Sequence, residues 1–383
     1  MNVTQLRENF PVVEKAIYLN HAAIGPSPLP VQNATQKWMV HHKNYGELYF
    51  KPLDQMYEEV NKDRRIIGNF INAQFPEEEI AFTYNTSYGL AAIAESIDWK
   101  KGQDKIILND LEYTSNSYTY QVLAQKFDLG TSIVRNRKGI LELEDFNLDQ
   151  DTRLVAISHV QFGNGFRIDL EELAKIVHEA GAYLIVDAIQ SCGAIPIDVQ
   201  KMNIDFLATG GYKWLLGPMG TGFIYLKKDL ANHLNPSFVG SMSDVNPMNL
   251  SHHDYVPGSG AKRFQASLGP NSTLLSEAVK FLANIGIYNI YNQIEKLSSL
   301  ILDFILDVPE FVLQSPIQHK NMRSGIINFK CPRAKEIVSE LRYLPKKIAI
   351  SYREGGLRLS PHFYNTEDEI IESLDQIRNL SQK

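Results

Sequence analysis

Two residues in the middle of the chain, Asp187 and Lys213, could do chemistry together. Asp187 follows the short apolar run 183–186, and Lys213 lies 26 residues later, in the segment 208–218 (ATGGYKWLLGP). Pyridoxal 5′-phosphate needs a lysine amine to which it bonds and an acid that keeps its pyridine nitrogen protonated. A carboxylate beside that nitrogen favours the charged ring by direct attraction, and the charged ring accepts electrons from a developing carbanion. The pair therefore indicates a pyridoxal phosphate site.

Each residue alone has a simpler interpretation. Lys213 could be a solvated loop lysine, and Asp187 could be the N-cap of a helix that follows a strand. The neighbours of Lys213 favour the cofactor instead, because Gly210 and Gly211 let the backbone pass close to a bound molecule. Tyr212 also precedes the lysine, and its hydroxyl could reach a phosphate group.

The elements that position these residues alternate between strand-like and helix-like patterns. Continuous apolar runs separated by helices are typical of a parallel sheet that is covered on both faces. Ligands of such sheets sit at the carboxyl ends of the strands, and that rule selects Asn85, Asp187 and Lys213. The predicted strands are 79–84, 105–108, 153–160, 183–186, 205–208 and 222–226, and the predicted helices in this region are 89–97 and 170–177.

After about residue 272 the pattern changes to a long helix, 274–300, followed by short strands at 325–329 and 348–351 and a final acidic helix, 367–380. We therefore predict an α/β fold with a mostly parallel large domain and a smaller α+β carboxyl-terminal domain. The predicted boundaries are an amino-terminal arm, 1–20, that packs with the small domain, a large domain, 21–271, and a small domain, 272–383.

A phosphate site is predicted where Asn85-Thr86-Ser87 ends a strand and opens a helix. Free backbone N–H groups and the helix dipole favour an anion at such a junction, and hydroxyl groups add donors. An ordinary helix N-cap that binds nothing is the alternative.

Composition narrows the class of protein. The chain has 383 residues, 44% hydrophobic content, a net charge of −6 and two cysteines, Cys192 and Cys331. Two cysteines are too few for a disulfide framework or a metal cluster, so no metal is expected. No long basic run favours nucleic acid, no apolar stretch is long enough for a membrane span, and the first twenty residues lack the apolar core of a secretory signal. We expect a cytoplasmic protein.

These motifs resemble the class V aminotransferase family of fold-type I pyridoxal-phosphate enzymes, which includes cysteine desulfurases, isopenicillin N epimerase-like proteins and C–S lyases. The resemblance runs from 18–26 (YLNHAAIGP) to 358–366 (RLSPHFYNT), and the block 158–220 is its most specific part. It implies the pyridoxal phosphate transferase fold and a homodimer with shared active sites.

The resemblance also implies roles for single residues. Lys213 would bond to the cofactor, Asp187 would hold the pyridine nitrogen and Gln190 would contact the ring hydroxyl. Tyr113 would stack on the cofactor ring, although a core tyrosine is the alternative. Thr86, Ser87 and Tyr212 would bind the cofactor phosphate, and Ser267, in the loop 263–269, would bind the phosphate in the partner subunit. Arg358 would bind the substrate carboxylate, and Asn20 and His21 would line the substrate pocket.

The sequence departs from the desulfurase pattern at two places. Desulfurases carry a cysteine on a loop shortly before the carboxylate-binding arginine, and here that stretch, 351–358, reads SYREGGLR. Phe162 stands where many relatives have asparagine, which removes a donor for the substrate carboxylate, although Gln161 could replace it. Both departures bear on the substrate more than on the cofactor.

The predicted function is chemistry at the α-carbon of an amino acid, with Lys213 as the base that removes the α-proton. Transamination is the first expectation because it needs no extra residue. A β-eliminating C–S lyase is the second, and an epimerase of the same family is also open. A catalytically weak cofactor-binding module is the alternative of another class.

Overall fold

A computed structural model describes residues 1–46, 53–248, 251, 253–267 and 271–383. Its largest sheet has seven strands in the order β2-β8-β7-β6-β5-β3-β4. Neighbouring strands are parallel except at β8, which runs antiparallel to both β2 and β7. The strands are β2 Ile80–Thr83, β3 Lys105–Asn109, β4 Gly130–Val134, β5 Thr152–Ser158, β6 Tyr183–Asp187, β7 Phe206–Gly210 and β8 Gly222–Leu226.

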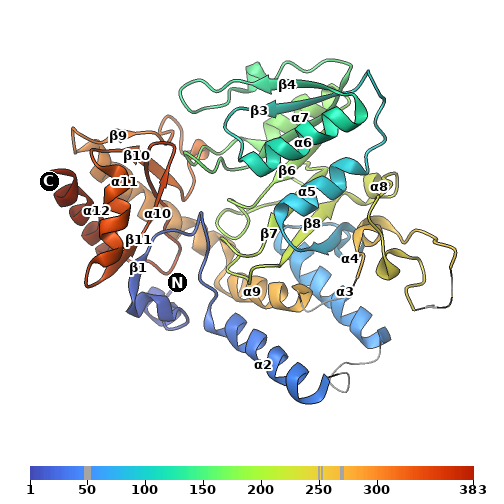
Figure 1. Cartoon of the computed structure of the whole chain (residues 1–383), viewed down its shortest axis with the longest axis horizontal. Coiled ribbons are helices and arrows are strands. Elements are labelled where there is room, and N and C mark those ends of the chain that lie inside the picture. Colours follow the sequence, from blue (N-terminus) through green and yellow to red (C-terminus); the bar gives the residue numbers. More distant parts are fainter. Residues whose placement is uncertain (47–52, 249–250, 252, 268–270) are drawn as a thin grey trace.

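Both faces of this sheet are covered by helices (Figure 1). Successive side chains of a strand point to opposite faces, and accordingly Leu184 and Ile185 belong to two different hydrophobic clusters. Helices α5 and α6 pack on one face, and α3, α7 and α9 pack on the other. The helices of this region are α2 Leu29–Tyr45, α3 Leu53–Phe70, α4 Pro76–Glu79, α5 Thr86–Glu95, α6 Thr114–Phe127, α7 Leu170–Glu179, α8 Lys228–Ala231 and α9 Asn271–Ile285.

The carboxyl-terminal part, orange to red in Figure 1, lies beside the large sheet and has its own core. Its sheet has the order β12-β13-β10-β9, and β11 pairs with the amino-terminal strand β1. These elements are β1 Ala16–Tyr18, α10 Ile287–Leu306, β9 Val312–Leu313, β10 Ile327–Lys330, α11 Ala334–Glu340, β11 Lys347–Ala349, β12 Ser351–Arg353, β13 Gly356–Leu359 and α12 Glu367–Ser381.

The predicted single helix 274–300 is wrong, because the chain forms two helices there. Gly286 separates α9 from α10 and has a φ of +89°, which is outside the helical region and is readily adopted only by glycine. The first helix, α9, contributes Leu275, Val279 and Leu282 to the core of the large sheet. By packing, α9 therefore belongs with the large sheet, although the predicted boundary at 271/272 would put it in the small domain.

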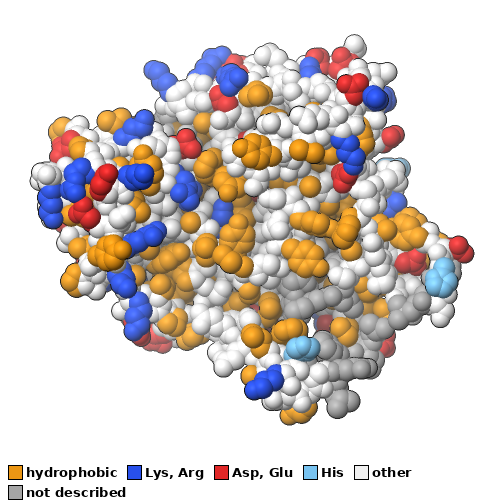
Figure 2. All heavy atoms as spheres, in the orientation of Figure 1, with side chains coloured by type: hydrophobic (Ala, Val, Ile, Leu, Met, Phe, Trp, Pro, Cys, Tyr) orange, Lys and Arg blue, Asp and Glu red, His pale blue; other side chains and the backbone are white. Residues whose placement is uncertain are grey.

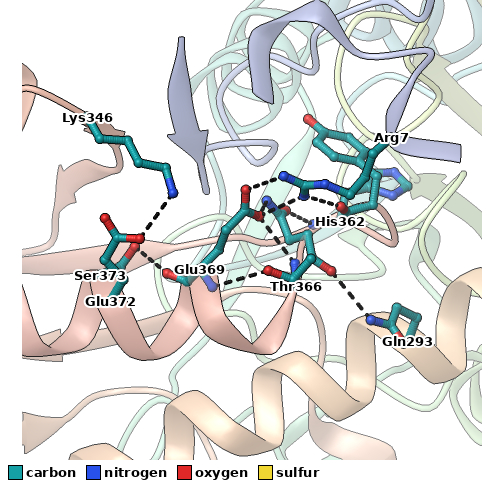
Figure 3. Close-up of polar contacts among 10 residues, drawn as sticks. Arg7, Gln293, Lys346, His362, Thr366, Glu369, Glu372 and Ser373 are labelled. Carbon is teal, nitrogen blue, oxygen red and sulfur yellow. Dashed lines mark hydrogen bonds and ion pairs between the residues drawn. The ribbon is translucent and has the colours of Figure 1, made fainter. Parts of the chain in front are cut away.

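The amino-terminal arm contacts the carboxyl-terminal part through charge and sheet pairing. In α1 (Val3–Arg7), the Arg7 guanidinium donates to both carboxylate oxygens of Glu369, at 3.0 and 2.7 Å, and to the carbonyl of Tyr364. Glu369 also accepts from the backbone N–H of Thr366, which caps α12 in return (Figure 3). The two ends of the chain thus stabilise each other.

Within the described residues, no helix is both long enough and apolar enough to cross a bilayer. The same part of the chain holds no group of three or more metal-ligating side chains placed around a common point.

Candidate active site

Lys213 lies in a tight turn that follows β7. The turn is closed by backbone hydrogen bonds from Gly217 to Gly211 and from Leu216 to Lys213. Gly25 approaches so closely that a Cβ there would lie 2.1 Å from the Lys213 carbonyl oxygen, so no other residue fits. Burial lowers the pKa of the Lys213 amine to about 8, and the nearby Asp187 carboxylate opposes that shift. A lysine of this kind exchanges protons near neutral pH.

Asp187 is the last residue of β6 and is almost fully buried. One of its oxygens accepts from the backbone N–H of Ile189 at 2.8 Å. Burial raises the pKa of this carboxyl to about 7, and the Ile189 N–H and Lys213 act in the opposite direction. A cation beside a buried carboxyl group stabilises its ionised form. Asp187 is therefore suited to bind the protonated ring nitrogen of pyridoxal phosphate.

Gln190 uses its side-chain amide within the protein. Its oxygen accepts from the indole N–H of Trp214 at 2.9 Å, and its nitrogen donates to the carbonyl of Ala22 at 3.0 Å. One amide hydrogen is left for another acceptor. The contact of Gln190 with the cofactor hydroxyl therefore stays a prediction, made through that hydrogen.

Thr86 and Tyr212 lie on either side of Gly210 at the carboxyl end of the large sheet, and Ser87, which is half-buried, follows Thr86 in the first turn of α5. Asn85 caps α5 by accepting from the N–H of Tyr88 at 2.8 Å, so the first N–H groups of the helix point past it. The Thr86 hydroxyl is buried and has no hydrogen-bond partner among the described residues. A Cβ on Gly210 would lie 3.3 Å from the Thr86 hydroxyl and 3.1 Å from the ring of Tyr212. The glycine therefore leaves a recess between these two side chains, which we call the phosphate cup. The cup fits an oxyanion such as the cofactor phosphate.

Tyr113, directly before α6, remains 49% exposed. Its ring packs edge-on against Phe162, with 5.1 Å between the ring centroids. A core tyrosine would be buried, so the alternative interpretation of Tyr113 loses support. An aromatic ring that is half open beside the lysine turn can stack on a flat ligand.

Glu112 is a residue whose importance the sequence did not reveal. Its buried carboxylate accepts from the side chains of Asn109 at 2.8 Å and Asn116 at 2.7 Å, from the N–H and hydroxyl of Ser158, and from the amide of Gln161 at 3.1 Å. These contacts fix the position of Tyr113 relative to β5. They also occupy the side-chain amide of Gln161, which we suggested could bind the substrate carboxylate in place of the asparagine that Phe162 replaces. The signal available in the sequence was the spacing of two asparagines around this acid: Asn109 lies three residues before Glu112, and Asn116 lies four residues after it.

Arg358 of β13 is 2% exposed and has no carboxylate partner among the described residues. Its guanidinium donates to the Phe162 carbonyl at 2.7 Å and to the Ser351 hydroxyl at 3.2 Å. Burial, and then the charge of Arg353, lowers the pKa of Arg358 to about 9. A buried guanidinium without a counter-ion fits a substrate carboxylate.

Asn20 and His21 have different surroundings. The Asn20 side-chain oxygen is buried, and no residue that the structure describes forms a hydrogen bond with it. His21 is fully buried, and its two ring nitrogens bond to the Ser360 carbonyl at 2.9 Å and the Tyr364 hydroxyl at 2.7 Å. Burial and nearby His362 hold the pKa of His21 well below its usual value. Both ring nitrogens of His21 are thus occupied by protein groups, and its predicted place in the substrate pocket stays a prediction.

Ser267 is exposed, and its carbonyl accepts from the Gln265 amide at 2.8 Å. The loop 263–269 in which it was predicted to act extends beyond the described residues at 268–269. Its role toward a partner subunit stays a prediction.

Neither cysteine is placed for sulfur chemistry. Cys192 is buried behind the lysine turn, and Cys331 follows β10. Burial raises the pKa of both thiols to about 12. The segment before Arg358 is a tight hairpin whose turn residues, Glu354 and Gly355, have φ values of 51° and 77°. Two such residues form the two-residue turn typical of hairpins, which leaves no room for an extended loop.

The fold and the site together define a pyridoxal-phosphate enzyme of fold type I. The sequence profile of the family Aminotransferase class-V matches residues 17–370, and the chain belongs to this family. Its cofactor is pyridoxal 5′-phosphate.

Several relatives cover nearly the whole chain. A protein of Pyrococcus abyssi named "Probable cysteine desulfurase" is 30% identical over 98% of this chain and 96% of its own. A Bacillus subtilis protein named "Uncharacterized aminotransferase YcbU" is 27% identical over 97% and 96%. The solved structure of a cysteine desulfurase from Thermococcus onnurineus, in its apo form, superposes with a TM-score of 0.87 at 26% identity, covering 99% and 98% of the two chains.

Proposed function

We propose that this enzyme is a C–S lyase that breaks the bond between the β-carbon and sulfur of a cysteine-type amino acid. The observation that carries the proposal is the hairpin 351–358, which holds Arg358 but has no cysteine and no loop to carry one. Two of the three relatives named above are called cysteine desulfurases, which points to sulfur-containing amino acids. Because the hairpin before Arg358 carries no thiol to receive the sulfur, and Cys192 and Cys331 lie elsewhere, the sulfur leaves with a product. Elimination is therefore favoured over transamination, which was the first expectation from sequence.

The residues divide the work as follows. Arg358 binds the substrate carboxylate and fixes the orientation of the α-carbon. Lys213, whose pKa is lowered to about 8, accepts the α-proton at Nζ. The Asp187 carboxylate would stabilise the positive charge of the cofactor's protonated ring nitrogen. The bound cofactor supplies an electron sink for the α-carbon.

The net reaction with cysteine balances without an oxidant. Cysteine and one water give pyruvate, ammonia and hydrogen sulfide, because loss of sulfur from the β-carbon leaves an enamine that water hydrolyses. The proton that Lys213 accepts can return to the departing sulfur, so one group serves as acid and base in turn.

Product identity tests the proposal. The holoenzyme is incubated with L-cysteine, L-cystine, L-alanine and L-glutamate, and pyruvate, ammonia, sulfide and keto acids are measured together with optical rotation. We expect L-cysteine to give pyruvate and sulfide, and L-cystine to give pyruvate and cysteine persulfide, in equal amounts, with no product from alanine or glutamate. Keto acid from alanine or glutamate that depends on a second keto acid as acceptor would establish the aminotransferase, and racemised alanine would establish the epimerase.

The same experiment tests the alternative of a weak cofactor-binding module. A cofactor absorbance band that no amino acid alters, together with no product, would favour that module. The uncompensated buried charge of Arg358 argues for a substrate, because a cofactor scaffold has no use for it.

We further propose a homodimer that completes the site with Ser267. Exposed aromatic side chains gather next to the phosphate cup: Tyr84 packs edge-on with Tyr88, and Tyr88 packs with Phe238, which is 60% exposed. Hydrophobic side chains are spread across the face of the molecule that Figure 2 shows. An apolar surface of this kind is typical of a protein contact. Light scattering should give twice the mass of one chain, and Ser267→Ala should weaken cofactor retention without separating the subunits.

A further inference from the structure

The carboxylate of Glu112 lies beside the strand end that carries Asp187. Glu112 is 8% exposed, and its two oxygens accept from the backbone N–H of Ser158 at 2.6 Å and from the Ser158 hydroxyl at 2.7 Å. Ser158 of β5 pairs with Asp187 of β6 in the parallel register, and neighbouring strands lie about 4.8 Å apart. Paired residues of parallel strands point to the same face of the sheet, so Ser158 holds the Glu112 carboxylate on the face that Asp187 occupies.

Every hydrogen bond that Glu112 accepts comes from a neutral group. The donors are three side-chain amides and the two groups of the serine: Asn109, Asn116, Gln161 and Ser158. None of the ion pairs formed by the described residues includes Glu112. Hydrogen bonds donated to a carboxylate favour its ionised form. Glu112 therefore brings a negative charge into the core that no adjacent cation neutralises.

That charge acts on Asp187. Burial is the main cause that raises the pKa of Asp187 to about 7, and the charge of Glu112 adds to it, while Lys213 acts in the opposite direction. The other titratable side chains that face this carboxyl group are two tyrosines. Burial raises the pKa of Tyr120 well above its usual value and also raises the pKa of Tyr212, so both hydroxyls are neutral. Within the described part of the chain, Glu112 is thus the one further negative charge that acts on Asp187.

We propose that Glu112 is a positioning residue that acts through Asp187 and helps to keep the ring nitrogen of bound pyridoxal 5′-phosphate protonated. A negative charge behind the Asp187 carboxylate favours a proton anywhere between that carboxylate and the ring. The attraction is stronger in a buried site than in water because the effective dielectric constant is lower there. This role concerns the cofactor alone, so it holds for elimination and transamination alike, and its failure would leave the proposed function standing.

Nuclear magnetic resonance of the holoenzyme, loaded with pyridoxal phosphate that carries ¹⁵N in its ring, measures the protonation of that nitrogen directly. We expect Glu112→Gln to lower the pKa of the ring nitrogen by roughly one pH unit, the size of effect that one charge has in a buried site. Asp110→Asn is the matched control, because it removes a charge two residues away that already pairs with Arg135 at 3.7 Å. The control should titrate like the native enzyme. A native titration of Glu112→Gln overturns the proposal.

A third variant separates the charge of Glu112 from its shape. Glu112→Asp keeps the charge and shortens the side chain, whereas Glu112→Gln keeps the length and loses the charge. We expect Glu112→Asp to titrate closer to the native enzyme than Glu112→Gln does. A merely structural role predicts the reverse order, and that order would also overturn the proposal. If Glu112→Gln does not fold, Glu112→Ala removes the charge and leaves space for water to accept from the same donors, and the same decrease of the ring pKa is expected.

Discussion

The cofactor end of the site and the substrate end are built differently. Around Lys213, Gly25 packs against the Lys213 carbonyl more closely than any other residue could, and Gly210 leaves room between the side chains of Thr86 and Tyr212. Around Arg358, a short hairpin of the smaller sheet reaches across to the Phe162 carbonyl. The first region fits pyridoxal 5′-phosphate, and under the proposed function the second would decide which amino acid binds and which product forms. Differences among relatives are therefore expected to concentrate in the hairpin.

The largest effect should come from the cofactor end. Lys213→Ala should lower the rate of product formation by a factor of about a thousand or more, because it removes the proton acceptor and the attachment point of the cofactor. The absorbance band of the attached cofactor should disappear as well. Lys335→Ala, on the remote helix α11, is the control and should behave like the native enzyme. A variant at position 213 that kept both band and activity would remove the assignment.

The substrate end should respond in KM more than in the cofactor spectrum. Arg358→Gln should raise KM for the amino acid by about 10- to 100-fold, since a hydrogen-bonded charge is lost at the carboxylate. Arg353→Gln, on the same hairpin but exposed, should have a much smaller effect. Steady-state kinetics and cofactor titration on both variants make the comparison. If Arg358→Gln lost cofactor but kept KM, the division between the two ends would be wrong.

Stability of the hairpin gives a third measurement. Gly356→Ala would place a Cβ 2.3 Å from the Asn328 side-chain oxygen and 2.6 Å from the Phe329 carbonyl oxygen. Overpacking of this kind typically costs about 1–3 kcal/mol of unfolding free energy. Gly130→Ala is the matched control, because its nearest contact would be an ordinary 3.4 Å. Denaturant unfolding should give a lower free energy of unfolding for Gly356→Ala than for Gly130→Ala. Equal values would show that the hairpin adjusts to the added methyl group at little cost.

The smallest effect concerns the pH dependence of the cofactor-free protein. Because the folded pKa of Asp187, about 7, lies above its usual value, the folded state binds the proton more tightly. The contribution of Asp187 to the unfolding free energy is thus greatest at acidic pH and falls as the pH rises through 7. Asp187→Asn should flatten this part of the curve. Denaturant unfolding at pH 5 and 8 checks the sign, and a native protein that gained stability over this interval relative to the variant would contradict it.

Local sequence predicted the buried strands well. The runs around 80–83, 105–109, 152–158, 183–187, 206–210 and 222–226 are all strands of the large sheet, because a strand that is covered on both faces is apolar at nearly every position. The exposed edge strand β4 gave no such signal. The break at Gly286 was also missed, since glycine is tolerated within helices and the apolar pattern continues on both sides.

The sequence by itself determined the cofactor chemistry, because a strand-end acid, a glycine-flanked lysine and a helix start lie close together along the chain. Tertiary structure alone decided the commitment of His21 to Ser360 and Tyr364, the engagement of Gln161 by Glu112, and the pairing of Arg358 with the Phe162 carbonyl. Each of those contacts joins residues between 49 and 343 positions apart. No local pattern specifies such pairs, because they depend on how the two sheets pack against each other.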